Sequence, residues 1–291
     1  MQRPQKWWTV WTGIILVLLY IPLVSVILAS LANTRYLRFP HRIWTIQPYR
    51  EALGLVQTYD LQMTSLKIAL CVAVVSVLIA IPGALAFARY DWSGRKLYQR
   101  LLLLPVFFPQ SVLGLAALVS LSAMGFDLSW KTAVFTHAVW IVPIATLIVS
   151  IQVYGLDRAQ EEAAFDLGAS RLQAFFRVTF PQILPGLSSG ALFAFLLSWS
   201  NLPLSAYTTG VDTTLPEWLY SRMSTNFAPM APAVSVLSIL ASIVFVLIWQ
   251  SGRVVVQGII ERRSGSRIVR IGCGVRRGST QRMSSSRSSP R

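Results

Sequence analysis

The stretch IALCVAVVSVLIAIPGALAFA, residues 68–88, decides the class of fold because it contains no Asp, Glu, Lys or Arg. A helix needs about 20 apolar residues to cross about 30 Å of hydrocarbon. Five other stretches are at least as long and equally free of charge: residues 10–32, 101–124, 132–153, 187–208 and 232–252. The sequence therefore predicts an all-α polytopic membrane protein with six transmembrane helices.

The composition excludes several other classes of protein. Of the 291 residues, 54% are hydrophobic and only 13% are charged, whereas soluble domains average about 25% charged. A soluble enzyme and a nucleic-acid-binding domain are excluded on this ground. The net charge of +15 is better explained by the anionic headgroups of a lipid bilayer than by nucleic acid.

The distribution of basic residues predicts the orientation in the membrane. With the amino terminus inside, the cytoplasmic segments before residue 264 hold twelve basic residues and the outer segments hold seven. Seven more lie in the tail, residues 264–291. The positive-inside rule then predicts that both termini lie in the cytoplasm. Residues 10–32 are longer than the apolar core of a signal peptide, which favours a retained first helix over a cleaved one.

The connection at residues 154–186 differs from the others because it is acidic and amphipathic. Asp157 is placed to cap a short helix over residues 159–167, and Gly168 permits a break after it. Ser170 and Gln173 have the spacing of a capping box that starts a second helix. We expect two short helices here, separated by a turn.

The second of these helices carries an apolar stripe at helical spacing: Leu172, Phe175, Phe176 and Thr179. We expect Pro181 and Pro185 to end the helix before the fifth span. The stripe needs an apolar surface to pack on, which is either its own bundle, a partner protein or the lipid interface.

The sequence of this connection, EEAAFDLGASRLQAFFRVTFPQILPGL at residues 161–187, resembles the EAA loop of permease subunits in binding-protein-dependent ABC importers. TSLKIA at residues 64–69 is similar to the start of the core domain of that family, and DTTLPEWLYSRM at residues 212–223 to the last outer loop of its spermidine/putrescine-type subgroup. The resemblance implies the type I ABC importer permease fold, in the inner membrane of a bacterial cell. It implies an ATPase-coupling role for Glu162, Ala163, Ala164, Gly168, Ser170, Leu172, Phe175, Phe176 and Pro181.

The same resemblance implies a set of partners. They are two ABC ATPase subunits, a second permease subunit and an extracytoplasmic solute-binding protein. The second permease is expected to be a different chain, with a homodimer as the alternative. Three regions follow: residues 1–63 with the first helix and outer loop, the permease core at 64–252, and a basic tail at 253–291 whose Arg- and Ser-rich composition is typical of disorder.

The chain is not expected to be an enzyme. None of its four lysines stands in a phosphate-binding G-x-x-x-x-G-K-[ST] motif, so ATP and Mg²⁺ are expected on the partner ATPase subunits, and we expect no cofactor or metal on this chain. His137, inside the fourth span, is interpreted as a packing residue in preference to a proton carrier. The alternative function is a stand-alone secondary carrier or channel, which would leave the EAA-like loop unexplained.

Polar residues within the spans are the sequence's only indication of a solute path. These are Gln110 and Ser111 in the third span, and Ser198, Ser200 and Asn201 in the fifth. Lining a path and bonding neighbouring helices are both consistent with such residues. No acid lies near them, and burying a polycation without a counter-charge is costly. The solute is therefore left open between a polyamine and another small organic solute.

Overall fold

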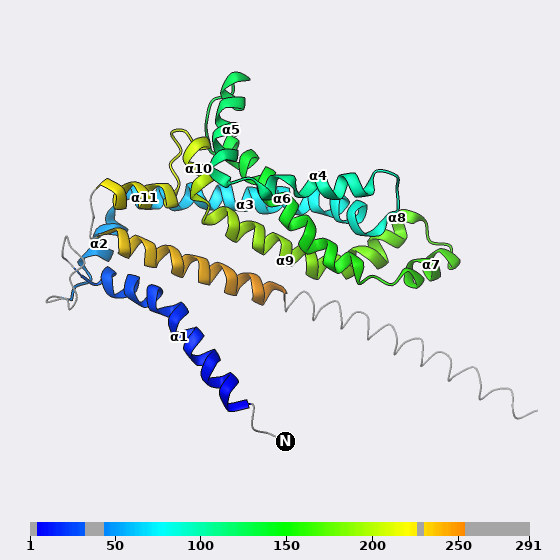
Figure 1. The fold of residues 1–291 in the computed structure, drawn as a ribbon, viewed down its shortest axis with the longest axis horizontal. Helices are drawn as coiled ribbons and strands as arrows, with labels where there is room; N and C mark the ends of the chain where they lie inside the picture. Colours follow the sequence, from blue (N-terminus) through cyan, green and yellow to red (C-terminus); the bar gives the residue numbers. More distant parts are fainter. Residues whose placement is uncertain (1–4, 33–43, 226–229, 254–291) are drawn as a thin grey trace, which may run out of the picture. The chain divides into compact units, whose positions relative to one another are not determined.

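The structure, a computed structural model, describes residues 5–32, 44–225 and 230–253, and these are almost entirely helical (Figure 1). The elements in chain order are α1 (Gln5–Ser30), α2 (Gln47–Gly54), α3 (Val56–Ala84), η1 (Leu85–Arg89), α4 (Arg95–Phe107), α5 (Gln110–Ala123), α6 (Trp130–Tyr154), α7 (Arg158–Asp166), α8 (Arg171–Ala174), η2 (Phe175–Thr179), α9 (Phe180–Trp199), α10 (Leu202–Thr208) and α11 (Leu215–Thr225). A last helix covers Met230–Arg253. The two η elements are π-helical turns.

Five of the described helices are long and apolar enough to span a membrane: Trp7–Ser30, Val56–Arg89, Trp130–Tyr154, Arg171–Trp199 and Met230–Arg253. The pair α4 and α5 makes a sixth span if its two halves are counted as one. This agrees with the predicted all-α membrane protein of six spans.

The third predicted span is not one straight helix, which corrects the expectation for residues 101–124. The axes of α4 and α5 differ by 98°. Pro109 disfavours the helical conformation of the residue before it, and Phe108 is indeed extended, with φ −78° and ψ 139°. The break therefore follows from local sterics at Phe108–Pro109.

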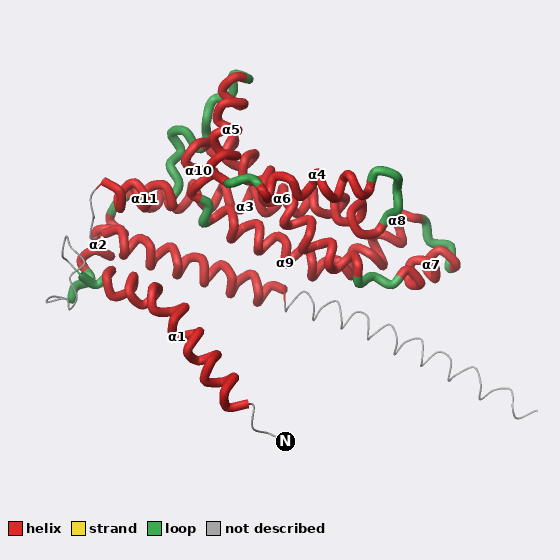
Figure 2. Tube along the Cα trace, in the orientation of Figure 1, coloured by secondary structure: helices red, strands yellow, loops and turns green. Residues whose placement is uncertain are grey.

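The helices α3, α6 and α9 pack together and form the centre of the described bundle (Figures 1 and 2). Their shared core consists of Ala80, Ala84, Ala145, Val149, Val153, Ile183 and Leu187. Small residues allow membrane helices to approach one another closely. Close packing is needed because an apolar side chain is as favourably placed against lipid tails as against another helix. A Cβ atom at Gly186 would lie 2.8 Å from the Cβ of Gln152, so α6 and α9 touch at that point.

The short second loop helix does not end at the prolines, contrary to the sequence expectation. α8, η2 and α9 are continuous, so residues 171–199 form one span-length helix. Pro181 follows the η2 turn directly, and the N–H of Phe180 donates to the oxygen of Phe175. A π turn widens the helix by one residue, so the ring of Pro181 avoids the carbonyl that it would meet in a regular helix. Pro185 lies within α9 and does not stop it.

Two short helices, α2 and α11, lie in the loops at the other end of the bundle. Ala52, Leu61, Leu215, Trp218 and Val234 form a second apolar cluster there.

The chain divides into two compact units, Met1–Ile243 and Val244–Arg291. Of the second unit only residues 244–253 are described, and they are helical. The predicted disorder of the basic tail therefore concerns residues outside the described part of the chain, apart from Arg253.

Candidate functional site

The acidic connection begins with the predicted capped helix. The carboxylate of Asp157 accepts a hydrogen bond from the backbone N–H of Ala159 at 3.0 Å, which caps α7. Glu161 lies in the first turn of α7, where the helix dipole favours an acid. Ala163 and Glu162 are exposed and Ala164 is half-buried.

Gly168 ends α7 by adopting a left-handed backbone conformation with φ 82°. The N–H of Gly168 donates to the oxygen of Phe165 at 2.8 Å, and the N–H of Ala169 to the oxygen of Ala164 at 3.0 Å. This pair of bonds is a Schellman motif, which satisfies carbonyls at a helix end and requires a residue that tolerates positive φ. The predicted break at Gly168 is therefore present and depends on glycine.

Ser170 starts the second helix with the predicted capping box. Its hydroxyl accepts from the N–H of Gln173 at 3.3 Å, and the side chain of Gln173 accepts from the N–H of Ser170 at 3.0 Å. The turn at residues 167–170 is thus fixed on both sides, by a C-cap and by an N-cap. The direction in which α8 leaves α7 is set locally.

The apolar stripe of the second helix is divided between an exposed part and a buried part. Leu172 and Phe176 are 70% and 57% exposed, Phe175 is half-buried, and Thr179 is buried. Exposed large apolar residues also occur on either side of Asp166, at Phe165 and Leu167. The connection therefore presents apolar side chains that no described part of the chain covers, which is typical of a surface that binds another molecule.

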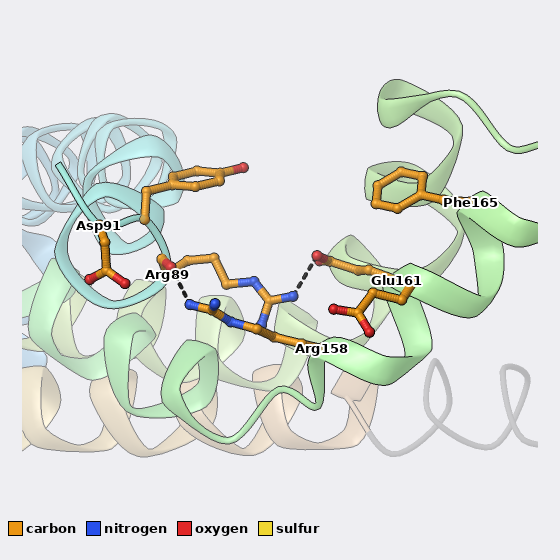
Figure 3. Close-up of a pocket in the computed structure, with 7 residues that line it drawn as sticks. Arg89, Asp91, Arg158, Glu161 and Phe165 are labelled. Atoms are coloured by element: carbon orange, nitrogen blue, oxygen red, sulfur yellow. Dashed lines mark hydrogen bonds and ion pairs between the residues drawn. The ribbon is translucent and has the colours of Figure 1, made fainter.

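Glu161, and not Glu162, holds the connection to the bundle (Figure 3). One carboxylate oxygen forms an ion pair with Arg89, the last residue of η1. The other accepts a hydrogen bond from the hydroxyl of Thr179, the last residue of η2. Arg158 adds a bond from its guanidinium to the backbone oxygen of Arg89 at 3.1 Å. In this connection the acid that pairs with a basic residue is therefore Glu161, the neighbour of the motif acid Glu162.

The environment of Glu161 keeps it ionised. Desolvation on burial acts to raise the pKa of Glu161, but hydrogen bonds from Thr179 and Arg89 and the positive charges of Arg89 and Arg158 outweigh it and lower the pKa overall. The carboxylate therefore keeps both partners at physiological pH.

A surface hollow lies beside this ion pair, and its charges are mixed. It is lined by Arg89, Tyr90, Asp91, Arg158, Glu161, Glu162 and Phe165. Two guanidinium groups face three carboxylates there, which does not suit a phosphate or a metal ion. No group of three or more His, Cys, Asp or Glu side chains that would suit a metal occurs among the described residues.

The polar residues of the fifth span lie at a break between α9 and α10. Asn201 caps α10, because its side-chain oxygen accepts from the N–H of Leu204 at 3.0 Å. Asn201 and Ser198 are buried, whereas Ser200 is exposed and bonds back to the oxygen of Leu196.

His137 of α6 holds this break from both sides. Its Nδ1 lies 2.9 Å from the hydroxyl of Ser198 in α9, and its Nε2 lies 3.1 Å from the hydroxyl of Ser205 in α10. A neutral imidazole supplies one donor and one acceptor, which matches two hydroxyl partners. This geometry agrees with the packing role that the sequence favours.

Gln110 and Ser111 are the first residues of α5, directly after the break at Pro109. Gln110 is half-buried and Ser111 is exposed. The polar residues of the third and of the fifth predicted span thus both lie at breaks between two helices. The helices that follow these breaks, α5 and α10, pack against each other. The structure does not bring the two groups of polar residues into direct hydrogen-bond contact.

Sequence reasoning missed the contacts of Arg89 and Thr179 with Glu161. Arg89 is 72 residues from Glu161 in the sequence, and neither position carries a local motif. A signal was present, because Glu161 is one of few acids in a basic chain and precedes the recognised motif.

Comparison with known proteins matches residues 76–255 to the family described as "Binding-protein-dependent transport system inner membrane component". The chain is 28% identical over 239 residues to the putrescine transport system permease protein PotI of Escherichia coli K12, covering 78% of this chain and 85% of the relative. It is 26% identical to the spermidine/putrescine transport system permease protein PotC of the same organism, covering 79% and 87%. The molybdenum transport system permease protein ModB of Haemophilus influenzae is also similar, at 28% identity, with 66% and 95% covered.

Solved structures agree on the fold. A bacterial ABC transporter involved in the import of the acidic polysaccharide alginate superposes with a TM-score of 0.63 at 16% identity, covering 86% of this chain and 98% of that chain. The MetNI methionine ABC transporter superposes with a TM-score of 0.53, covering 76% and 97%. The family match covers more than half of the sequence and includes the whole connection with its Schellman turn and capping box. The chain belongs to the binding-protein-dependent transport system inner membrane components, the permease subunits of ABC importers.

Proposed function

We propose that this permease forms, with a second permease subunit, a path for a small polar solute. An extracytoplasmic binding protein delivers the solute, and ATP hydrolysis on separate ATPase subunits drives its import. The observation that carries the proposal is the connection at residues 154–186, which is fixed by caps on both sides of Gly168 and leaves Leu172 and Phe176 exposed. A stand-alone carrier or channel has no use for such an element.

The connection acts as the coupling loop. ATP-driven closure of two ATPase subunits moves transmembrane helices only through a rigid element that contacts an ATPase subunit and is also fixed to the transmembrane helices of the permease. α8 continues into η2 and α9, so a protein that grips Leu172 and Phe176 acts on a span directly. Burial of the exposed parts of these two side chains, 70% and 57%, contributes about 2–4 kcal/mol to an interface.

The orientation that goes with this function places the coupling loop and both termini in the cytoplasm. The distribution of basic residues, twelve against seven before residue 264, supports it. The loop that contains α11 then faces the side from which the binding protein delivers solute.

The polar residues at the two broken spans are the candidate lining of the path: Gln110, Ser111, Ser198, Ser200 and Asn201. Ser111 and Ser200 are exposed within the described residues, so they are open to solute or to the second permease. Ser198 and Asn201 stabilise the break, and they shape the path rather than contact solute.

The solute class is polyamine or another small organic solute. Similarity to PotI and PotC supports a polyamine. The absence of acids from the described residues of α9 and α10 speaks against a polycation bound inside this subunit. Mass spectrometry of the ligand retained by the cognate binding protein, followed by uptake of that ligand, decides between them.

Site-specific crosslinking tests the coupling loop. A cysteine introduced by Leu172→Cys in a chain without its native cysteines should crosslink to an ATPase subunit, and Leu53→Cys should not. Leu53 is the matched control because it is 72% exposed and lies in α2, toward the other end of α3. Equal crosslinking at both positions, or none at residue 172, would contradict the assignment.

A further inference from the structure

The carboxylate of Glu161 joins two π-helical turns that are far apart in sequence. η1 forms the end of the span Val56–Arg89, and η2 lies near the start of the span Arg171–Trp199. Glu161 contacts the last residue of each turn, Arg89 and Thr179, with a different oxygen. π turns are rare and occur mostly at functional positions, and here one side chain of α7 holds both.

The side chains of Arg89, Glu161 and Thr179 are largely buried, so each of them needs its partners. The Arg89 side chain is 9% exposed and that of Glu161 is 24% exposed, and Thr179 is 3% exposed. A partly buried charge is stable only when paired, and removal of one partner leaves the other uncompensated. The three side chains therefore depend on one another.

Two further hydrogen bonds tie α7 to the same two spans. Arg158 donates to the backbone oxygen of Arg89, and Gln182 of α9 donates to the side-chain oxygen of Gln160 at 2.8 Å. α7 is thus attached on one side to the end of α3–η1 and on the other to η2–α9. The exposed apolar residues of the loop are carried by the element that makes these attachments.

We propose that Glu161 is a positioning residue that locks α7 to both π turns, so that a displacement of the coupling loop reaches the spans α3 and α9 together. This inference rests on the proposed coupling function of residues 154–186. Without the contacts of Glu161, α7 is joined to the bundle through its backbone connections, the Arg158 bond to the backbone oxygen of Arg89 and the Gln160–Gln182 bond, and the η1 turn loses its ion pair. ATP hydrolysis then continues with less solute moved.

The test uses the complete reconstituted complex, with binding protein present, and measures solute taken up per ATP hydrolysed. Glu161→Gln and Thr179→Val each remove part of the lock while nearly preserving side-chain volume. We expect solute per ATP to fall about fivefold or more for Glu161→Gln, with normal permease content and normal recovery of ATPase subunits in a pull-down. Asp166→Asn, which removes an exposed carboxylate from the same helix, is the matched control and should keep the wild-type ratio.

A double-mutant cycle shows whether the groups act as one unit. If the lock exists, Arg89→Ala combined with Glu161→Ala lowers solute per ATP no further than Glu161→Ala alone. Additive effects, a wild-type ratio in both Glu161→Gln and Thr179→Val, or loss of ATPase subunits from Glu161→Gln would each overturn the positioning role. Gly168→Val separates this failure from that of the coupling loop: if it still abolishes transport, only the lock is wrong, and if it too has no effect, the coupling assignment is wrong as well.

Discussion

Replacement of Gly168 by valine tests the proposed coupling loop. Gly168 is the one residue of this loop, residues 154–186, whose left-handed backbone conformation is unfavourable for a residue with a side chain. The φ of Gly168 is 82°, and a Cβ atom added there would have no atom within 4 Å. The cost of the substitution is therefore conformational, not a clash with neighbouring groups. An L-residue in this region costs about 1–2 kcal/mol, and a β-branched one more.

The magnitude follows from what the turn holds. If valine forces the backbone out of the left-handed region, the two Schellman bonds from Gly168 and Ala169 are lost as well. Each is worth about 0.5–1.5 kcal/mol. A total near 2–3 kcal/mol lowers the equilibrium constant between the correctly turned loop and other loop conformations by roughly 30- to 150-fold, since about 1.4 kcal/mol corresponds to a factor of ten.

The assay compares three substitutions in complexes with equal permease content. Asparagine tolerates positive φ better than other side chains, so Gly168→Asn should retain most ATPase binding and uptake. Gly168→Ala should be intermediate, and Gly168→Val should lose both. All three should insert normally, because no span changes in hydrophobicity.

The relative ATPase recovery and uptake of the three variants distinguish an effect of backbone conformation from an effect of side-chain size. Wild-type ATPase recovery and uptake in Gly168→Val would refute the reasoning at its centre. Equal loss in Gly168→Asn and Gly168→Val would show that the position fails on side-chain size, and not on backbone conformation.

Further predictions concern pH, packing and the tail. Because the pKa of Glu161 is lowered, its ionised carboxylate stabilises the folded loop at every pH above the ordinary glutamate pKa, and this stabilisation is lost only as the pH falls through the lowered value. The amount of solute taken up per ATP should therefore stay constant from about pH 8 to 5.5. An inflection near pH 6 that Glu161→Gln abolishes would contradict this prediction. His137→Leu leaves the buried hydroxyls of Ser198 and Ser205 without a ring partner, so thermal unfolding should show a loss of about 1–3 kcal/mol, whereas an unchanged melting temperature would show that these bonds contribute little. Gly186→Val should destabilise the α6–α9 contact by about 1–3 kcal/mol, because its Cβ would lie 2.8 Å from that of Gln152; normal stability in detergent would contradict that close approach. Removal of residues 264–291 should leave insertion and uptake intact, and loss of complex assembly would show that the tail is a docking element.

Local chemistry made much of the coupling loop predictable. The caps at Asp157 and Ser170 and the break at Gly168 each depend on residues within a few positions of one another, so a single sequence carries the information. The same holds for the apolar spans, whose length alone identifies them.

Contacts between distant segments were not predictable in this way. The pairing of Glu161 with Arg89 depends on how α3 packs against the rest of the bundle, and nothing near Arg89 marks it as a partner. The continuation of α8 through Pro181 depends on a π turn, which has no reliable sequence signal. The bend at Phe108–Pro109 had a visible cause in the proline, but hydrophobic length alone indicates one span.

The most direct test of the central claim compares uptake by vesicles that contain this chain alone with uptake by vesicles that contain it together with the second permease and the ATPase subunits. The account predicts that the chain alone transports nothing and hydrolyses no ATP, while the complete complex takes up the ligand of the binding protein only when ATP and that protein are present. Uptake by the chain alone, with or without an ion gradient, would contradict the account and identify an independent carrier or channel.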